Sequence, residues 1–164
     1  MRSTSIALAA LLATAAPAAL AAPAPADRAF LTQEARGTAY ELAIAQLAAE
    51  QSSRDDIKAY ARRIVSDHET SNAALRQLAQ SKGVSLPDGM TRDQQTRLAG
   101  LRKLKGAAFD DAYLKEIKRI NADDKQDFAK EAKETQDPDI RSYVQRFSAM
   151  DAEHERAAGQ LPTS

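Results

Sequence analysis

Apolar residues recur every three or four positions along most of this chain, and that spacing gathers them on one face of a helix. The pattern is clearest in two stripes, Ile57-Ala61-Ile64-His68-Ser71-Leu75-Leu78 and Ile140-Val144-Phe147-Asp151-His154-Ala158-Leu161. Alternating β-branched residues, which favour strands, never extend over more than a few positions. The sequence therefore predicts an all-α fold.

Capping residues and helix breakers delimit the predicted helices. Ser53 is the expected N-cap of the second helix, and Gly83 is its expected stop. Thr91 opens a short helix through a capping box with Gln94, and Gly106 ends that helix. Asp137 precedes a proline at the first position of the last helix. The long helices are expected at about 27–51, 54–82, 107–135 and 138–160.

The length of these helices limits how they can pack. Helices of roughly 22 to 29 residues are about 35 to 40 Å long, which suits a four-helix bundle better than a globin-like packing. The first pair and the last pair have tight turns, whereas the connection at 83–106 is long and contains the short helix. We therefore expect a ferritin-like four-helix bundle with a helix-containing crossover between helices two and three.

The beginning of the chain has the pattern of a secretory signal peptide. A basic start at Arg2 precedes an apolar run at 6–20, and small residues allow cleavage after Ala21 or, alternatively, after Ala26. No second apolar stretch is long enough to span a membrane, and cysteine is absent. We expect an exported, periplasmic protein. Its expected parts are a signal peptide at 1–22, a disordered leader at 23–26 and a helical domain at 27–161.

Charge and composition exclude several classes of function. The chain has 23 basic and 23 acidic residues, interspersed along the predicted helices, and no tryptophan. Nucleic-acid binding would need a basic face or an aromatic stacking surface, so no nucleic-acid partner is expected. A nucleophile on a strained turn and a glycine-rich phosphate loop are both missing, so an enzyme is not the favoured interpretation.

The two histidines of the chain, His68 and His154, occupy positions where a bundle normally places leucine or isoleucine. Burying them costs free energy unless they are hydrogen-bonded, paired or metal-bound. Glu41 lies about 12 residues before the first turn and His68 about 15 after it, and the last two helices show a similar balance. A polar layer is therefore expected at mid-height. Its expected members are Glu41 (or Leu42 in its place), His68, Asn121 or Asp124, Asp151 and His154, with Glu34 nearby.

Two interpretations of this layer stay open. In the first, it binds a single Fe, Mn, Zn or Cu ion through Glu41, His68, Asp124, Asp151 and His154. In the second, neutral histidines hydrogen-bond to the acidic and amide groups and only fix the helix register.

A di-iron centre is less well supported. It would need a carboxylate three residues before His68, where Val65 stands. The charged neighbours Asp67, Glu69, Glu153 and Glu155 are expected to face solvent.

From Phe30 to Leu161 the chain resembles the DUF4142 family of exported bacterial proteins, which implies a ferritin-like fold without an established activity. The matching residues are Phe30, Glu41-Leu42, Ala61, Asp67-His68, Gly83, Leu86-Pro87, Leu101, Phe109-Asp110-x-x-Tyr113 and His154. Similar proteins often carry a histidine where this chain has Asn121. An amide is a poor ligand for such metals, so this difference would weaken a site shared by helices two, three and four.

Three functions follow from these observations. The favoured one is a small, non-catalytic envelope protein, with a stress-related role considered, whose polar layer holds one metal ion. The alternative is an envelope interaction module that meets a protein partner through its outer face and whose layer is structural. The least supported is a metal-dependent oxidase or peroxide-handling bundle. The oligomeric state is left open.

Overall fold

The computed structural model describes residues 22–162, and this part of the chain contains five helices and no strand. They are α1 (Pro25–Gln51), α2 (Asp55–Ser81), α3 (Arg92–Arg102), α4 (Gly106–Glu134) and α5 (Pro138–Gln160). The prediction of an all-α fold is confirmed. The signal peptide predicted at 1–22 lies almost wholly outside the described residues. None of the described helices has the length and apolar character needed to cross a membrane.

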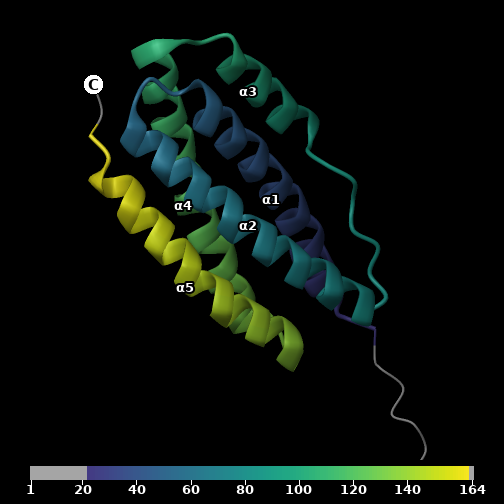
Figure 1. The fold of residues 1–164 in the computed structure, drawn as a ribbon. Helices are drawn as coiled ribbons and strands as arrows, with labels where there is room; N and C mark the ends of the chain where they lie inside the picture. The colour runs from purple at the N-terminus through teal and green to yellow at the C-terminus, as the bar shows by residue number, and fades with distance from the viewer. Residues whose placement is uncertain (1–21, 163–164) are drawn as a thin grey trace, which may run out of the picture.

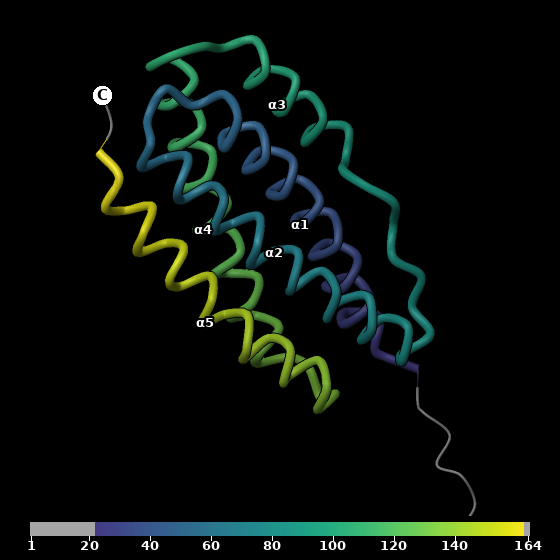
Figure 2. The backbone as a smooth tube through the Cα atoms, viewed as in Figure 1, coloured from purple at the N-terminus to yellow at the C-terminus, as the bar shows by residue number. Residues whose placement is uncertain are grey.

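The four long helices lie side by side, as Figure 1 shows. α1 packs against α2 and α4, and α5 packs against the same two helices. The connection between α2 and α4 runs the length of the molecule and carries α3 on its way (Figure 2). Consequently α4 begins at the end of the molecule where α2 begins, and these two helices run in the same direction.

Two boundaries differ from the expected ones. α1 begins at Pro25, so Pro25 and Ala26 form its first turn and are not part of a disordered leader. Proline suits this position because its fixed φ is already helical and the missing N–H would have no partner there. At α2 the N-cap is Arg54, which forms no side-chain cap hydrogen bond, so the prediction that Ser53 caps this helix is wrong.

Other predicted boundaries agree with the structure. Thr91 and Gln94 form both hydrogen bonds of a capping box at the start of α3. The Asp137 carboxylate accepts hydrogen bonds from the backbone N–H groups of Asp139 and Ile140 at 2.9 and 3.2 Å. Gly106 has a φ of 55°, a conformation that favours glycine, and it redirects the chain into α4.

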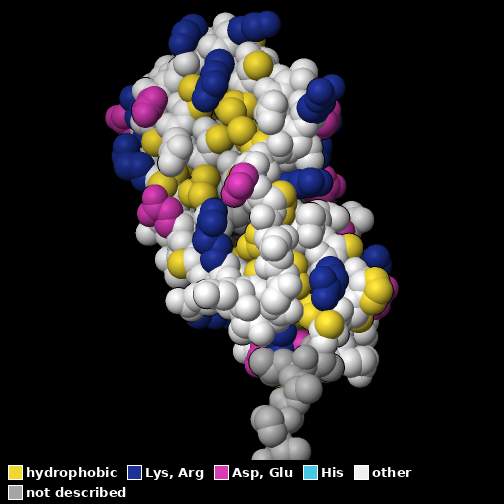
Figure 3. Space-filling view, turned by 90° about the vertical axis from the view of Figure 1, so that its right-hand side faces the viewer, with side chains coloured by type: hydrophobic (Ala, Val, Ile, Leu, Met, Phe, Trp, Pro, Cys, Tyr) yellow, Lys and Arg dark blue, Asp and Glu magenta, His cyan; other side chains and the backbone are white. Residues whose placement is uncertain are grey.

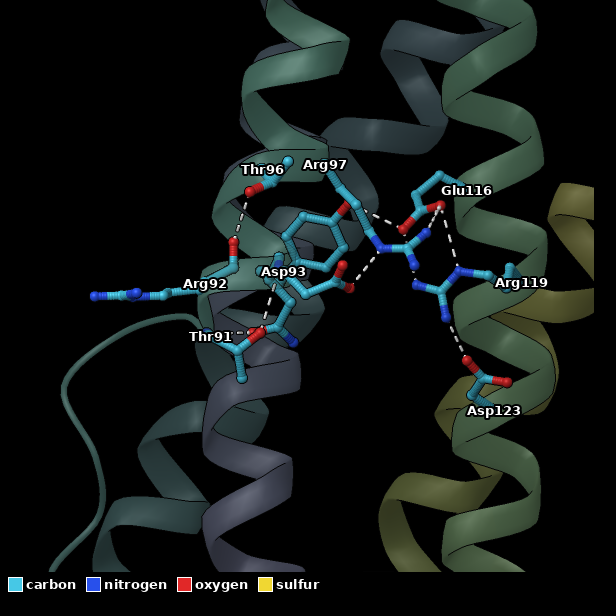
Figure 4. A network of polar contacts seen from close by, with 10 residues as sticks. Thr91, Arg92, Asp93, Thr96, Arg97, Glu116, Arg119 and Asp123 are labelled. Atoms are coloured by element: carbon cyan, nitrogen blue, oxygen red, sulfur yellow. Dashed lines mark hydrogen bonds and ion pairs between the residues drawn. The ribbon is translucent and has the colours of Figure 1, made fainter.

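Helix α3 is joined to α4 by a network of ion pairs (Figure 4). The Arg97 guanidinium of α3 lies 3.7 Å from the Glu116 carboxylate of α4, and Arg119 approaches the same carboxylate at 2.8 Å. Arg119 also pairs with Asp123, and the Tyr40 hydroxyl of α1 donates to Glu116 at 2.9 Å. Glu116 therefore links three helices. On the face that carries α3, basic and acidic side chains are interspersed and neither histidine is visible (Figure 3).

The apolar core consists of two clusters of buried side chains, one toward each end of the molecule. The first lies near the turn between α1 and α2 and includes Tyr40, Ile44, Ile57, Ile64, Phe109, Tyr113, Leu114 and Ile117. The second lies near the turn between α4 and α5 and includes Phe30, Leu31, Leu75, Phe128, Ile140, Val144 and Phe147. The residues between the two clusters are polar.

Asp110 ties the start of α4 to the turn between α1 and α2. Its side chain is fully buried and accepts hydrogen bonds from the Ser52 hydroxyl at 2.6 Å and the Ser53 hydroxyl at 2.5 Å. The backbone N–H of Ser53 also donates to it, at 3.4 Å. Ser53 thus serves this contact and not the cap of α2.

We expect Asp110→Ala to lower the free energy of unfolding by about 2 kcal/mol or more, because it removes three hydrogen bonds and leaves the buried Ser52 hydroxyl with only the Arg54 carbonyl oxygen, 3.3 Å away, as acceptor. Urea denaturation followed by circular dichroism measures the change. Asp123→Ala on the same helix is the control, since it removes only an exposed ion pair and should cost about 0–1 kcal/mol. Equal losses in the two variants would contradict this role of Asp110.

Candidate metal centre

A polar layer separates the two apolar clusters at mid-height. Each of the four long helices contributes to it. Its members are Thr38 and Glu41 of α1, His68 and Ser71 of α2, Asn121 of α4, and Asp151 and His154 of α5. All of them except Asp151 are at most 4% exposed. The layer arises because these residues occupy the helix faces that carry the apolar stripes.

His68, Asp151 and His154 converge within this layer. Each offers one ligand atom, and these atoms all lie within 4.8 Å of one another. The two imidazole rings are 5.5 Å apart between centroids, and the rings are inclined by 40°. Ligand bonds to a transition metal are about 2 Å long, so a small inward shift of these side chains would bring all three onto one ion.

The His154 imidazole is held from behind by Asp67 of α2. His154 Nε2 lies 2.8 Å from Asp67 Oδ2, and the Arg63 guanidinium approaches the same oxygen at 3.4 Å. An ionised carboxylate can only accept, so the imidazole carries its proton on Nε2. The other nitrogen, Nδ1, is the one that faces Asp151, with 4.0 Å to Asp151 Oδ1.

The His68 imidazole has a carboxylate on the corresponding nitrogen. His68 Nε2 lies 3.0 Å from Glu41 Oε2, and both side chains are almost fully buried. The two groups are close but are not aligned as a hydrogen bond, and neither nitrogen of His68 has a hydrogen-bond partner among the described residues. Burying an imidazole without a hydrogen-bond partner costs free energy, and a metal ion bound to His68 would offset that cost.

Burial shifts the pKa values of the ionisable side chains in and near the layer in the direction that favours their neutral forms. Burial lowers the pKa of His68 and of His154, so both imidazoles are neutral at neutral pH, the form that binds metals. Burial and the charge of Glu41 raise the pKa of Asp151 to about 7. Burial also raises the pKa of both Glu41 and Asp124. The charge of Glu34 adds to the rise at Glu41, and the charge of Glu41 adds to the rise at Asp124.

The structure separates the five predicted ligands into two groups. His68, Asp151 and His154 come together, whereas Glu41 touches the site only through His68. Asp124 is not part of the cluster: it interacts with Glu41, and with Glu34 it lines a pocket of about 140 Å³ between α1 and α4. Asp67 was expected to face solvent, but its side chain is only 31% exposed because it reaches across to His154. The sequence signal that could have placed Asp67 at the site is its position directly before His68.

Asn121 lies in the polar layer but adds no metal ligand to it. It is 4% exposed, and its Nδ2 has no hydrogen-bond partner among residues 22–162. The Tyr60 hydroxyl lies nearby, but it donates to the His154 carbonyl oxygen at 3.4 Å and does not form a hydrogen bond of normal geometry with the amide. Asn121 thus brings an unused donor to the place where the sequence comparison anticipated an imidazole.

The chain belongs to the family described as a domain of unknown function, DUF4142. The family model matches residues 12–161. No curated protein sequence in the comparison matches significantly.

Three solved structures share the fold at low sequence identity. A DUF305 fragment from Deinococcus radiodurans has a TM-score of 0.75 and 13% identity, covering 85% of this chain and 99% of that one. CopM in its Cu(II)-bound form has a TM-score of 0.70 and 15% identity, covering 82% of this chain and 93% of CopM. CopM in its Ag-bound form has a TM-score of 0.67, with the same identity and coverage.

Without added metal, we expect the melting temperature to fall by several degrees between pH 6.5 and 8.5. Burial raises the pKa of Glu34 and of Asp151 to about 7 and that of Glu41 to about 8, so at pH 6.5 the folded protein holds protons that the unfolded chain has already released. Such stability is present at low pH and is lost as pH rises through the folded pKa. The histidines, whose pKa values are lowered, cost stability only below about pH 6.5, so they do not offset the fall.

The variant Glu34→Gln should make this decline shallower, because its amide does not titrate and still accepts the hydrogen bond that the Tyr143 hydroxyl donates at 2.9 Å. Asp151, whose pKa is also raised to about 7, should keep part of the decline. Glu50→Gln, at an exposed position of the same helix, is the control and should keep the full decline. Melting temperatures of the wild type and both variants are measured in metal-free buffer across this pH range. A wild-type melting temperature that rises over this pH range would contradict the pKa shifts.

Proposed function

We propose that this protein is an exported, ferritin-like four-helix bundle that holds one transition-metal ion in the periplasm through His68, Asp151 and His154. The observation that carries the proposal is the convergence of two buried imidazoles and a carboxylate within 4.8 Å. Binding and not catalysis is its function. The basic start and the apolar run at 6–20 support export.

The environment of the two histidines supports metal binding over a purely structural layer. A metal-binding histidine usually donates its second ring N–H to a carboxylate, which fixes the tautomer and raises the basicity of the ligand nitrogen. Asp67 stands at Nε2 of His154, and Glu41 stands at Nε2 of His68. The Asp67 contact therefore leaves Nδ1 of His154 as its ligand atom. We assign the same role to Nδ1 of His68, because its Nε2 lies 3.0 Å from the Glu41 carboxylate. A structural histidine would satisfy both of its nitrogens, whereas those of His68 are unpaired.

The donor set favours Cu(II) among the candidate metals. Imidazole suits zinc, copper, iron and nickel, and for a given site Cu(II) binds most tightly among the divalent first-row ions. The fold shared with Cu(II)-bound CopM agrees with this choice. Three protein ligands leave at least one coordination position open.

Purified mature protein, stripped of metal, should bind one equivalent of Cu(II) in a competition titration. Saturating copper should stabilise the fold, by about 2.7 kcal/mol at a free concentration of 100 Kd. His68→Ala and Asp151→Asn should each weaken binding more than about 100-fold, since loss of a ligand exceeds the 10–100-fold effect of an outer partner. Asp123→Asn, an exposed acid, is the control.

Zn(II), Fe(II) and Mn(II) are titrated in parallel to establish the order of affinities. The absence of stoichiometric binding of any of these ions would end the proposal. So would an affinity unchanged in the double variant His68→Ala/His154→Ala. In either case the polar layer is structural, and an outer face is left as the place of function.

Asp67→Asn should reduce copper affinity by about 10- to 100-fold, because it replaces the carboxylate at His154 Nε2 by a neutral amide, which is a weaker acceptor and no longer raises the basicity of the ligand nitrogen. Glu69→Gln is a matched control: it lies on the other side of His68 and is exposed. The same competition titration measures both variants. Equal affinities would show that Asp67 does not support a metal ligand.

A further inference from the structure

A groove between α4 and α5 leads to the metal centre. Its volume is about 310 Å³, at the lower end of the 300–1,000 Å³ typical of small-molecule sites. Asp151 and Asn121 are part of its lining, as are the apolar side chains of Phe128 and Ala132. The groove therefore reaches a proposed metal ligand from the surface of the molecule.

Side chains of α1 and α2 lie against the two histidines of the metal centre. Glu41 covers His68 from α1, and Asp67 covers His154 from α2. Asp151 is the one ligand of the three that lines the groove. An exogenous molecule that reaches an open coordination position of the ion would accordingly come from the side of α4 and α5.

Asn121 indicates what kind of group the groove accepts. Its Nδ2 is a buried donor that lies near the Tyr60 hydroxyl but forms no hydrogen bond of normal geometry, and such a donor costs free energy until a better acceptor arrives. Lys125 also lines the groove, where its ammonium group pairs with Glu155 at 3.0 Å. One amide donor and one already paired cation match a single carboxylate better than a phosphate, which demands more donors and more positive charge.

We propose that the groove binds a short aliphatic monocarboxylate as a ligand of the metal ion, which rests on the proposed function. One carboxylate oxygen accepts a hydrogen bond from Asn121 Nδ2, and the other occupies an open coordination position. The alkyl chain packs against Phe128 and Ala132. Metal is required, because the ion supplies both the coordination position and the positive charge that a second carboxylate needs beside Asp151.

Butyrate and acetate are suitable probes for this site. After one equivalent of Cu(II) has been shown to bind, each acid is titrated into the copper-loaded protein, and Cu(II) absorption, electron paramagnetic resonance and binding heat are recorded. We expect butyrate to perturb the copper spectrum and to bind about tenfold more tightly than acetate, because it buries two more methylenes. The metal-free protein should bind neither.

Two variants test the groove itself. Asn121→Leu should weaken butyrate binding at least tenfold while copper still binds, whereas Gln126→Leu, an exposed amide on the same helix, should not. If Asn121→Leu does not fold, Ala129→Phe fills the groove from an exposed position and should block butyrate.

The outcomes separate this proposal from the proposed function. A protein that binds no copper overturns both. A copper-loaded protein whose spectrum butyrate does not change overturns the groove site alone. Butyrate binding that is equal without metal, or undiminished in both groove variants, also overturns it.

Discussion

The need to satisfy polar groups in the middle of the molecule governs this structure. Two apolar clusters would pack into one continuous core if leucines stood at the layer between them. Instead, seven polar side chains from four helices occupy that level, and six of them are at most 4% exposed. Burying these groups costs free energy, most of all at His68 and Asn121, which have nitrogens without hydrogen-bond partners among the described residues, so the layer fixes the register of the helices at the expense of stability.

The neighbours of the two histidines and of Asn121 explain the arrangement of the metal centre. Asp67 lies at Nε2 of His154, and Glu41 lies at Nε2 of His68. Nδ1 of His154 faces Asp151, and Nδ1 of His68 has no hydrogen-bond partner among the described residues. Asn121 leaves an amide donor at the α4 side, where the groove opens. Carboxylates of α1 and α2 thus lie against the histidines, and a groove reaches Asp151 between α4 and α5, an arrangement that suits an ion with one exchangeable ligand.

The helices were predictable because periodicity and capping are local properties. The stripe through Ile57 and His68 is buried in the structure at every predicted position, and the Asp137 cap follows from sequence alone. Ser53 was assigned to the wrong task because its partner, Asp110, lies far away in the chain. Local signals cannot reveal a competing long-range acceptor.

The site was predictable only in part, for a similar reason. Helical spacing and distance from the turns identified His68, Asp151 and His154 together with Glu41 and Asp124 as one layer. They did not determine which side chains meet, since that depends on which helices are neighbours and how they rotate. Asp67 was missed because it projects about 100° from His68 on its own helix, yet it contacts His154 on the adjacent one.

Anomalous diffraction from crystals soaked in Cu(II) tests metal binding at this layer most directly. We predict one strong copper peak in the layer, within bonding distance of Nδ1 of both histidines and an Asp151 oxygen. Copper found only at surface carboxylates, or bonded through Nε2 after displacement of Asp67 and Glu41, would contradict the arrangement described above.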